Sequence, residues 1–161
     1  MDLSLLKELY EKGLYVFVDT FSDWKEAVAC ACQPLIQKGY IDSGYVDGIY
    51  KNVEKNGFYI FIAPHICIPH CGAYESVQKN CLSFMKCNSP VLGDPDEPDM
   101  AAELFFVIAA ENEGKHLEEI QRLAEMLENE KIIAALLSLQ NEQDFVKLLY
   151  GNECLLSETC E

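Results

Sequence analysis

The sequence predicts an α/β protein of three layers, in which a mixed, largely parallel central sheet is flanked by helices on both faces. Short runs of β-branched and aromatic residues alternate with longer segments whose apolar residues recur every three or four positions. The chain has 161 residues, 50% of them hydrophobic, a usual size for one domain with a substantial core. No repeat, low-complexity run or Pro/Ser-rich linker divides it. We therefore expect a single domain over residues 1–161, with its core at about 14–150.

The first part of the chain has the composition of one strand and two long helices, after an amphipathic opening. Asp23 or Ser22 can cap the first long helix, and Pro34 inside it is expected to introduce a bend. Gly39 and Gly57 follow the two helical patterns, and glycine commonly stands just after a helix end. The predicted elements are the opening segment at 3–10, a strand at Tyr15–Val18, and helices at 23–38 and 42–56.

The remainder of the chain predicts strands first and then helices. Phe58–Ala63 is rich in β-branched and aromatic residues and stops at Pro64, which indicates a strand. Cys81–Met85 indicates another, and Glu103–Ala110 is apolar enough to be a strand buried on both faces of the sheet. Between them, Gly93–Pro98 has the residues of a surface loop. Helical patterns follow at 115–127, 132–139 and 141–149.

The charge balance excludes some classes of partner. The chain has 12 Lys and Arg residues against 27 Asp and Glu, a formal charge of −15, which opposes binding to nucleic acids and to anionic membrane surfaces. Acidity suits a basic protein partner, although it can equally serve solubility alone. No apolar run approaches the roughly 20 residues that span a bilayer, and the N-terminal segment lacks the pattern of a secretory signal. We therefore expect a cytoplasmic protein whose eight cysteines are reduced and mostly in the core.

The histidines carry the main chemical signal. His65 and His70 bracket one short segment after a predicted strand, and His116 lies where the buried strand runs into a helix. Free backbone N–H groups and helix dipoles favour anions at such strand ends. A neutral imidazole is a nucleophile that can accept a phosphoryl group, and a second imidazole with backbone amides can stabilise that group without a metal. The alternative is that a histidine beside a proline is an ordinary turn residue, or a partner of a backbone carbonyl.

A metal or redox function is a second hypothesis. His65, Cys67, His70 and Cys71 are all ligand types that zinc prefers, but their spacing fits none of the usual zinc patterns. The cysteines that motivate a metal or redox protein are Cys67, Cys71, Cys81 and Cys87. We expect no metal and no cofactor.

At these residues the sequence resembles the IIA components of the mannitol/fructose superfamily of the sugar phosphotransferase system (PTS), and most closely the ascorbate-type branch. The resemblance covers about residues 14–150. The segments that carry it are Trp24–Val28, Gly39–Ile41, Tyr45–Ile49, Gly57–Pro64, Ile66–His70, Glu75–Lys79, and Ala109–Ala110 with His116.

The resemblance implies a phosphoryl carrier on a largely parallel sheet covered by helices. His70 would accept the phosphoryl group from the phosphocarrier HPr and pass it to a cysteine of a IIB component, and His116 would assist. The sugar would never touch this chain, and the membrane would be reached only indirectly, through IIC. Since dimers are the commonest soluble oligomers, we also expect a homodimer. A IIA-like regulatory phosphoprotein, acting through phosphorylation-dependent protein contacts, is the alternative function.

The chain departs from the family pattern near His70. His65 stands where relatives usually have a small residue, and it is a possible auxiliary group. Cys71-Gly72-Ala73 follows His70 where relatives commonly have an arginine. Glu75 matches an acidic position and either orients an imidazole or is an exposed loop carboxylate. The candidates to replace the missing positive charge are Lys51, Lys55 and Lys79.

Overall fold

Short polar side chains set where the helices of this protein begin. The computed structural model describes residues 1–151. At the N-caps, the side chain of Asp23 accepts a hydrogen bond from the Lys25 amide at 3.0 Å, and that of Asp42 accepts one from Gly44 at 2.8 Å. Asn112 caps a later helix in the same way, because its side-chain oxygen lies 2.9 Å from the Lys115 amide. Each cap satisfies a backbone donor that the helix itself leaves unpaired.

The element order largely follows the predicted one. The helices are α1 (Ser4–Glu11), α2 (Trp24–Gln37), α3 (Ser43–Asn56), the 3₁₀ turn η1 (Tyr74–Ser76), α4 (Glu113–Leu127), α5 (Glu130–Ser138) and α6 (Glu142–Tyr150). The strands are β1 (Tyr15–Val18), β2 (Phe61–Ala63), β3 (His65–Cys67), β4 (Cys81–Leu92) and β5 (Ala101–Ala109). Within residues 1–151, every helix is too short or too polar to cross a bilayer.

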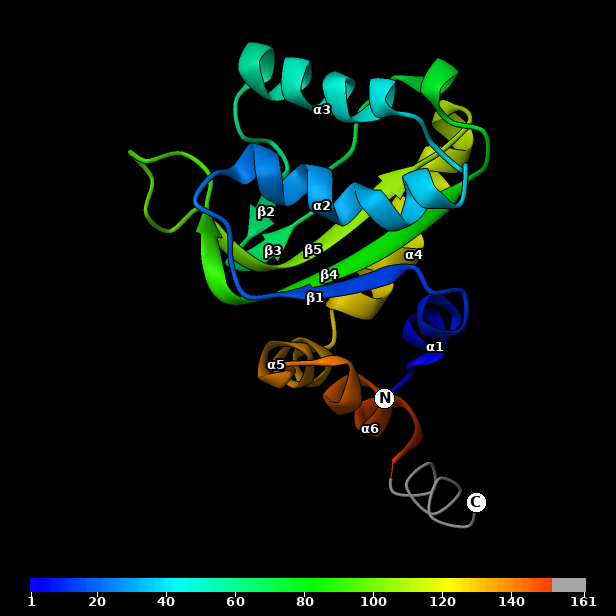
Figure 1. Ribbon diagram of the computed structural model, residues 1–161, viewed down its shortest axis with the longest axis vertical. Coiled ribbons are helices and arrows are strands. Elements are labelled where there is room, and N and C mark those ends of the chain that lie inside the picture. The colour runs from blue at the N-terminus through cyan, green and yellow to red at the C-terminus, as the bar shows by residue number, and fades with distance from the viewer. Residues whose placement is uncertain (152–161) are drawn as a thin grey trace.

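The strands form one mixed sheet in the order β1-β4-β5-β3-β2. The pairs β1·β4 and β3·β5 are parallel, whereas β4·β5 and β2·β3 are antiparallel. Helix α2 packs on one face with α3 outside it, and α1, α4, α5 and α6 lie on the other side (Figure 1). The predicted three-layer α/β architecture is confirmed.

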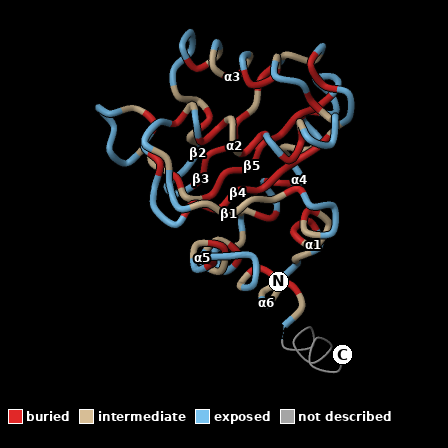
Figure 2. The backbone as a smooth tube through the Cα atoms, viewed as in Figure 1, coloured by how far each residue is buried: buried red, intermediate tan, exposed pale blue. Residues whose placement is uncertain are grey.

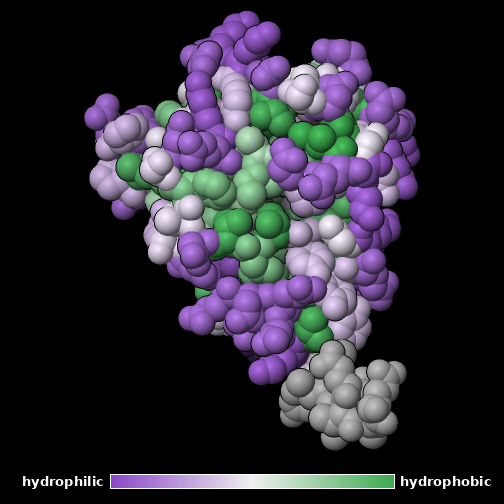
Figure 3. All heavy atoms as spheres, viewed as in Figure 1, coloured by the Kyte–Doolittle hydropathy of each residue, from purple (hydrophilic) through white to green (hydrophobic). Residues whose placement is uncertain are grey.

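The core lies along the central strands. In Figure 2 the tube is red along the first part of β4 and most of β5, and the side chains from Leu104 to Ala109 are fully buried, as predicted for this strand. A buried lysine caps the C-terminal end of α5: the Lys86 ammonium donates a hydrogen bond to the Leu139 carbonyl at 2.7 Å. On the face seen in Figure 3, hydrophilic residues cover α3, and apolar side chains form a band across α2 and the edge strand β1.

The prediction of one strand over Phe58–Ala63 is wrong in its first half. Phe58–Ile60 form a turn, and only Phe61–Ala63 make the strand β2. The chain then reverses at Pro64 and returns antiparallel as β3, which the sequence did not predict. His65 makes this tight reversal with a φ of 73°, a left-handed conformation rare for residues with a Cβ. Two further boundaries differ: β4 continues past the predicted end at Met85 to Leu92, and α4 begins at Glu113, two residues before its predicted start.

A buried tyrosine joins α3 to the two segments that carry the candidate histidines. The Tyr45 hydroxyl donates to the Ile108 carbonyl near the end of β5 and accepts from the Cys71 amide at 3.2 Å. The side chain is fully buried, so water cannot replace either bond. The Ile108 amide in turn donates to the Pro69 carbonyl at 3.2 Å. The residues on both sides of His70 are thereby bound to β5.

We predict that Tyr45→Phe lowers the free energy of unfolding by about 1–3 kcal/mol, because it leaves a buried amide and a buried carbonyl without a partner. Urea unfolding measures this. Tyr10→Phe is the matched control, since the Tyr10 ring packs in an aromatic cluster and its hydroxyl makes no hydrogen bond within residues 1–151. Equal losses in the two variants would contradict the role assigned to the Tyr45 hydroxyl.

Candidate functional site

His70 follows β3, and the chain orients its imidazole through a local hydrogen bond. The Nδ1 atom lies 2.6 Å from the Ile68 carbonyl oxygen, two residues earlier. A carbonyl only accepts, so Nδ1 carries the proton and Nε2 is left with a free lone pair. Burial lowers the pKa of His70 from its usual value, although the bond to Ile68 partly opposes this. The ring is therefore a neutral base at pH 7.

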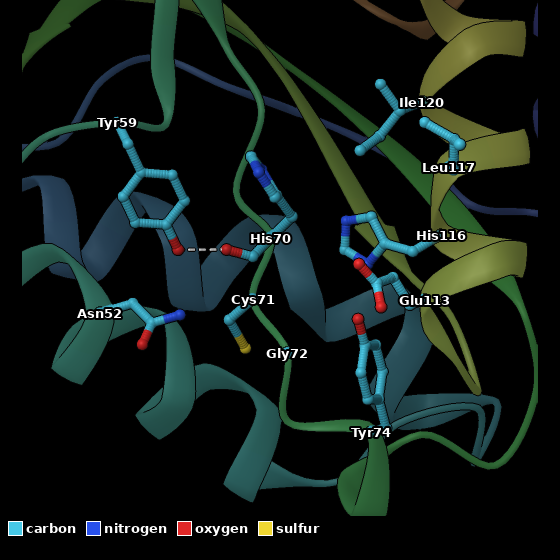
Figure 4. Close-up of a pocket in the computed structure, with 10 residues that line it drawn as sticks. All are labelled: Asn52, Tyr59, His70, Cys71, Gly72, Tyr74, Glu113, His116, Leu117 and Ile120. Atoms are coloured by element: carbon cyan, nitrogen blue, oxygen red, sulfur yellow. Dashed lines mark hydrogen bonds between the residues drawn. The ribbon is translucent and has the colours of Figure 1, made fainter. Parts of the chain in front are cut away.

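Tyr59 holds the other side of His70. Its hydroxyl donates to the His70 carbonyl, as the dashed line in Figure 4 marks. The two rings meet edge to face, with centroids 5.1 Å apart and planes at 88°. Burial raises the pKa of Tyr59 to about 12, so the hydroxyl keeps its proton at neutral pH. Backbone and ring of His70 are thus both held.

His116 reaches the same place from the first turn of α4. Its ring centroid is 5.4 Å from that of His70, and the side chain is only 8% exposed. Burial, and then the proximity of His70, lower the pKa of His116. Its Nδ1 is buried and has no hydrogen-bond partner among the described residues, so Nε2 is the nitrogen that faces the pocket. The structure brings His70 and His116 together.

The two imidazoles line one pocket of about 370 Å³. Figure 4 shows His70 entering from the loop after β3 and His116 from α4, with Tyr74 and Glu113 beside His116. Because residues of the first turn of α4 line the pocket, the positive end of this helix dipole lies there. The lining residues are Asn52, Tyr59, His70, Cys71, Gly72, Tyr74, Glu113, His116, Leu117 and Ile120.

An apolar groove of about 400 Å³ adjoins this pocket and shares His70 and Ile120 with it. One wall comes from the β2–β3 hairpin and the segment after it, and the other from α4 and α5. Ile62 on the hairpin is 51% exposed, which is unusual for a large apolar side chain. The remaining lining residues are Ala63, Ile66, Ile68, Ala124, Leu127, Glu128 and Ile133.

The two auxiliary residues suggested by the sequence lie outside the pocket lining. His65 is on β3, its side chain is 53% exposed, and its Nδ1 pairs with the Glu103 carboxylate at 2.7 Å. The left-handed turn at His65 and this pairing hold it away from His70. Glu75 is exposed on η1 and bonds to no imidazole within residues 1–151. The role of Glu75 in orienting an imidazole stays a prediction.

Sequence reasoning missed four pocket residues with polar side chains: Asn52, Tyr59, Tyr74 and Glu113. The sequence offers one indication for Glu113: it directly follows the helix cap Asn112 and thus falls in the first turn of α4. Tyr59 falls inside the strand predicted over Phe58–Ala63, and that prediction gives no sign that its hydroxyl donates to His70. Nothing local in the sequence distinguishes Asn52 or Tyr74.

The lysines suggested as replacements for the missing arginine do not line the pocket, and neither does any other lysine or arginine of the described chain. Lys79 lies instead over the Tyr40 ring, 4.8 Å from its centroid. Lys51 and Lys55 are exposed on α3.

The cysteines near the site are buried thiols. Burial raises the pKa of Cys71 to about 11 and that of Cys81 and Cys87 to about 12, and it raises that of Cys67 strongly. Such thiols stay protonated at neutral pH and are poor nucleophiles and metal ligands. Within residues 1–151, no three His, Cys, Asp or Glu side chains gather where they could hold a metal ion. The metal hypothesis finds no ligand set in this part of the chain.

We predict that His70 is an Nδ1–H tautomer at pH 7 and titrates below about 6.5, the value of a free imidazole. Nitrogen-detected NMR of the histidine rings measures both. The folded state binds this proton less tightly than the unfolded state does. The free energy of unfolding should therefore fall as the pH drops below about 6.5. A titration midpoint at or above the free value would contradict burial as the dominant influence on this imidazole.

Comparison with known proteins indicates the family of this chain. The sequence model of the phosphoenolpyruvate-dependent sugar phosphotransferase system, EIIA 2, matches residues 8–152. The ascorbate-specific PTS system EIIA component of Mycoplasma pneumoniae is 31% identical over 124 residues, which cover 76% of this chain and 77% of that protein.

Two solved structures share the fold. The mannitol-specific cryptic phosphotransferase enzyme IIA of Escherichia coli is 25% identical, with a TM-score of 0.74 over 86% of this chain and 92% of that one. Enzyme IIAMTL, solved in complex with phosphorylated enzyme IIBMTL of Escherichia coli, is 24% identical, with a TM-score of 0.69 over 84% and 94%. On the extent of the family match and the 31% identity, the chain belongs to the EIIA type 2 family of the sugar phosphotransferase system.

Proposed function

We propose that this EIIA component accepts a phosphoryl group from phospho-HPr on Nε2 of His70 and passes it to a cysteine of its IIB component. The observation that carries the proposal is the hydrogen bond from Nδ1 to the Ile68 carbonyl, which leaves Nε2 as the nucleophile beside a second imidazole. No further cofactor is needed for this chemistry.

The transfer balances on the groups present. The Nε2 lone pair forms a bond to phosphorus while the N–P bond of the donor breaks and its electron pair returns to the donor imidazole. In the second step a IIB thiolate attacks phosphorus, and the electron pair of the broken N–P bond returns to Nε2. The proton on Nδ1 stays hydrogen-bonded to the Ile68 carbonyl throughout, so His70 ends as it began.

His116 stabilises the group in transit. With Nδ1 buried, an Nε2–H tautomer donates from the pocket side to a phosphoryl oxygen, and the amides at the start of α4 add further donors. Arriving negative charge also favours the protonated form of His116, which opposes the effect of burial on its pKa.

Donor and acceptor use the same face of the molecule, because both have to reach Nε2 of His70. They therefore bind in turn. The apolar groove beside His70 offers each of them contact area, and the charge of −15 favours basic partners. A IIB component forms a complex with one relative of this fold, which supports IIB as the acceptor. We place this exchange in the cytoplasm, with the membrane reached only through IIC.

The name of the relative from Mycoplasma pneumoniae supports ascorbate as the sugar of the system, while another relative is named for mannitol. Incubating the phosphorylated protein with purified IIB components of ascorbate and mannitol systems separates these branches. Faster transfer to the ascorbate IIB is expected.

We predict that His70→Ala abolishes acid-labile phosphorylation by enzyme I, HPr and labelled phosphoenolpyruvate. The substitution removes the ring nitrogen that the bond to the Ile68 carbonyl leaves free as a nucleophile. His65→Ala is the control and should be phosphorylated normally, because His65 lies outside the pocket and pairs with Glu103. Acid-labile label on the His70→Ala variant would show that the acceptor is another residue. Labelling of the wild type without transfer to any IIB would favour the regulatory phosphoprotein.

We predict that His116→Ala still takes up phosphate on His70, more slowly, but passes it to IIB poorly. Removing this imidazole takes away a donor to the phosphoryl oxygens in the transition state, which typically costs about 10²–10³-fold in rate. Single-turnover transfer from the isolated phosphoprotein to IIB measures it. Normal transfer by this variant would exclude the assisting role.

A further inference from the structure

His116 has a ring nitrogen that the free protein leaves unpaired. Its Nδ1 atom is buried, and no residue of the described chain hydrogen-bonds to it. Such an atom is uncommon, because it has lost its bond to water and gained none from the protein. When Nε2 carries the proton, Nδ1 is a bare acceptor, and a second proton added there needs an acceptor of its own.

A phosphoryl group on His70 favours that second proton. The group carries about −1.5 to −2 charge at neutral pH. On Nε2 of His70 it lies beside His116, since the two ring centroids are 5.4 Å apart. Negative charge at this range favours the protonated form of an imidazole. The loaded state therefore raises a question that the free state does not, namely which group accepts the hydrogen bond from Nδ1–H.

Glu113 has a carboxylate beside the His116 ring. The two residues are three positions apart in the first turn of α4, a spacing that makes side chains neighbours on a helix. Figure 4 shows the Glu113 carboxylate in the pocket, next to the imidazole. Within residues 1–151 Glu113 belongs to no ion pair, whereas Lys115 on the same turn pairs with Glu118 at 3.4 Å. The carboxylate is therefore available to a new donor.

The other titratable groups that line the pocket suit this role less well. Burial, and then the proximity of His70, lower the pKa of His116, so the first imidazole opposes a second proton. The Tyr59 hydroxyl donates to a backbone carbonyl, and the Cys71 thiol lies 3.6 Å from another. The Tyr74 ring meets His116 edge to face at 6.4 Å, but a hydroxyl is a weaker acceptor than a carboxylate. No lysine or arginine of the described chain lines the pocket.

We propose that Glu113 is a positioning residue for His116: in the phosphorylated protein its carboxylate accepts a hydrogen bond from Nδ1 of the doubly protonated ring, whose Nε2–H donates to the phosphoryl group. This inference rests on the proposed function. One proton from the solvent adds to the Nδ1 lone pair as the group arrives, and it returns to the solvent when the group passes to IIB. The carboxylate stabilises the imidazolium and fixes its orientation.

The first test follows the ring protons of His116 by nitrogen-detected NMR of the full-length protein, with and without phosphate on His70. Glu113→Gln removes the charge and should lower the titration midpoint of His116 by about one pH unit in both states. Glu111→Gln is the matched control, because Glu111 precedes the same helix cap but lies outside the pocket lining. It should leave the midpoint unchanged, and so should Tyr74→Phe.

The second test measures single-turnover transfer from the phosphorylated protein to IIB as a function of pH. At neutral pH, Glu113→Gln should be roughly tenfold slower than the wild type, the effect of losing one charge-assisted hydrogen bond. The ratio of the two rates should approach one at a pH below both His116 midpoints, since the ring is then protonated in both proteins. A purely structural defect would give the same ratio at every pH.

Three results would overturn the inference: equal His116 midpoints in the wild type and Glu113→Gln, slowing of this variant that does not depend on pH, or a midpoint lowered by Tyr74→Phe instead. If the wild type takes no phosphate from phospho-HPr, the proposed function fails. The midpoints of the unphosphorylated proteins then decide alone whether Glu113 acts on His116.

Discussion

The hydroxyl of Tyr45 is the contact on which the candidate site depends. It bonds to Cys71, next to His70, and to Ile108, near the end of the strand that leads into α4 and His116. The two imidazoles come from segments 46 positions apart in the sequence, yet one side chain from a third element fixes both of those segments. Because the Tyr45 side chain is fully buried, breaking either bond leaves a polar group without a partner, and this costs free energy. The spacing of the imidazole pair is therefore a property of the core and does not depend on a flexible loop.

The electrostatics of the site differ from those expected of an anion site. A pocket that handles phosphate commonly contains lysine or arginine, whereas this one combines neutral imidazoles, a helix terminus and a carboxylate. In a chain of charge −15, such a pocket holds a free anion poorly.

Much of the fold follows from local signals in the sequence. Caps such as Asp23 and Asp42 act within two residues of themselves, and the apolar run of β5 is readable without knowledge of its neighbours. The meeting of His70 and His116 was also predictable in outline, since both follow strands of one sheet. The reversal at Pro64 was not predictable. A left-handed φ, as at His65, is uncommon for any residue with a Cβ, and tertiary contacts decide where it occurs.

The functional neighbours of His70 were harder to find for the same reason. Tyr59 bonds across 11 residues of chain, and Glu113 enters the pocket only because α4 begins two residues earlier than its apolar pattern suggested. Glu75 had the right position along the sequence but lies exposed on a 3₁₀ turn, facing solvent. Motif spacing points to candidate histidines, whereas the residues that surround them depend on how distant segments pack.

The bond between Nδ1 of His70 and the Ile68 carbonyl has a consequence for the chemical identity of the carrier state. Phosphohistidine exists as two regioisomers, one for each ring nitrogen. Because Nδ1 of His70 is hydrogen-bonded to the Ile68 carbonyl, phosphorylation on the free Nε2, as proposed, would give the tele isomer. The protein would thus carry a single, defined phosphoramidate species that every acceptor meets from the same direction.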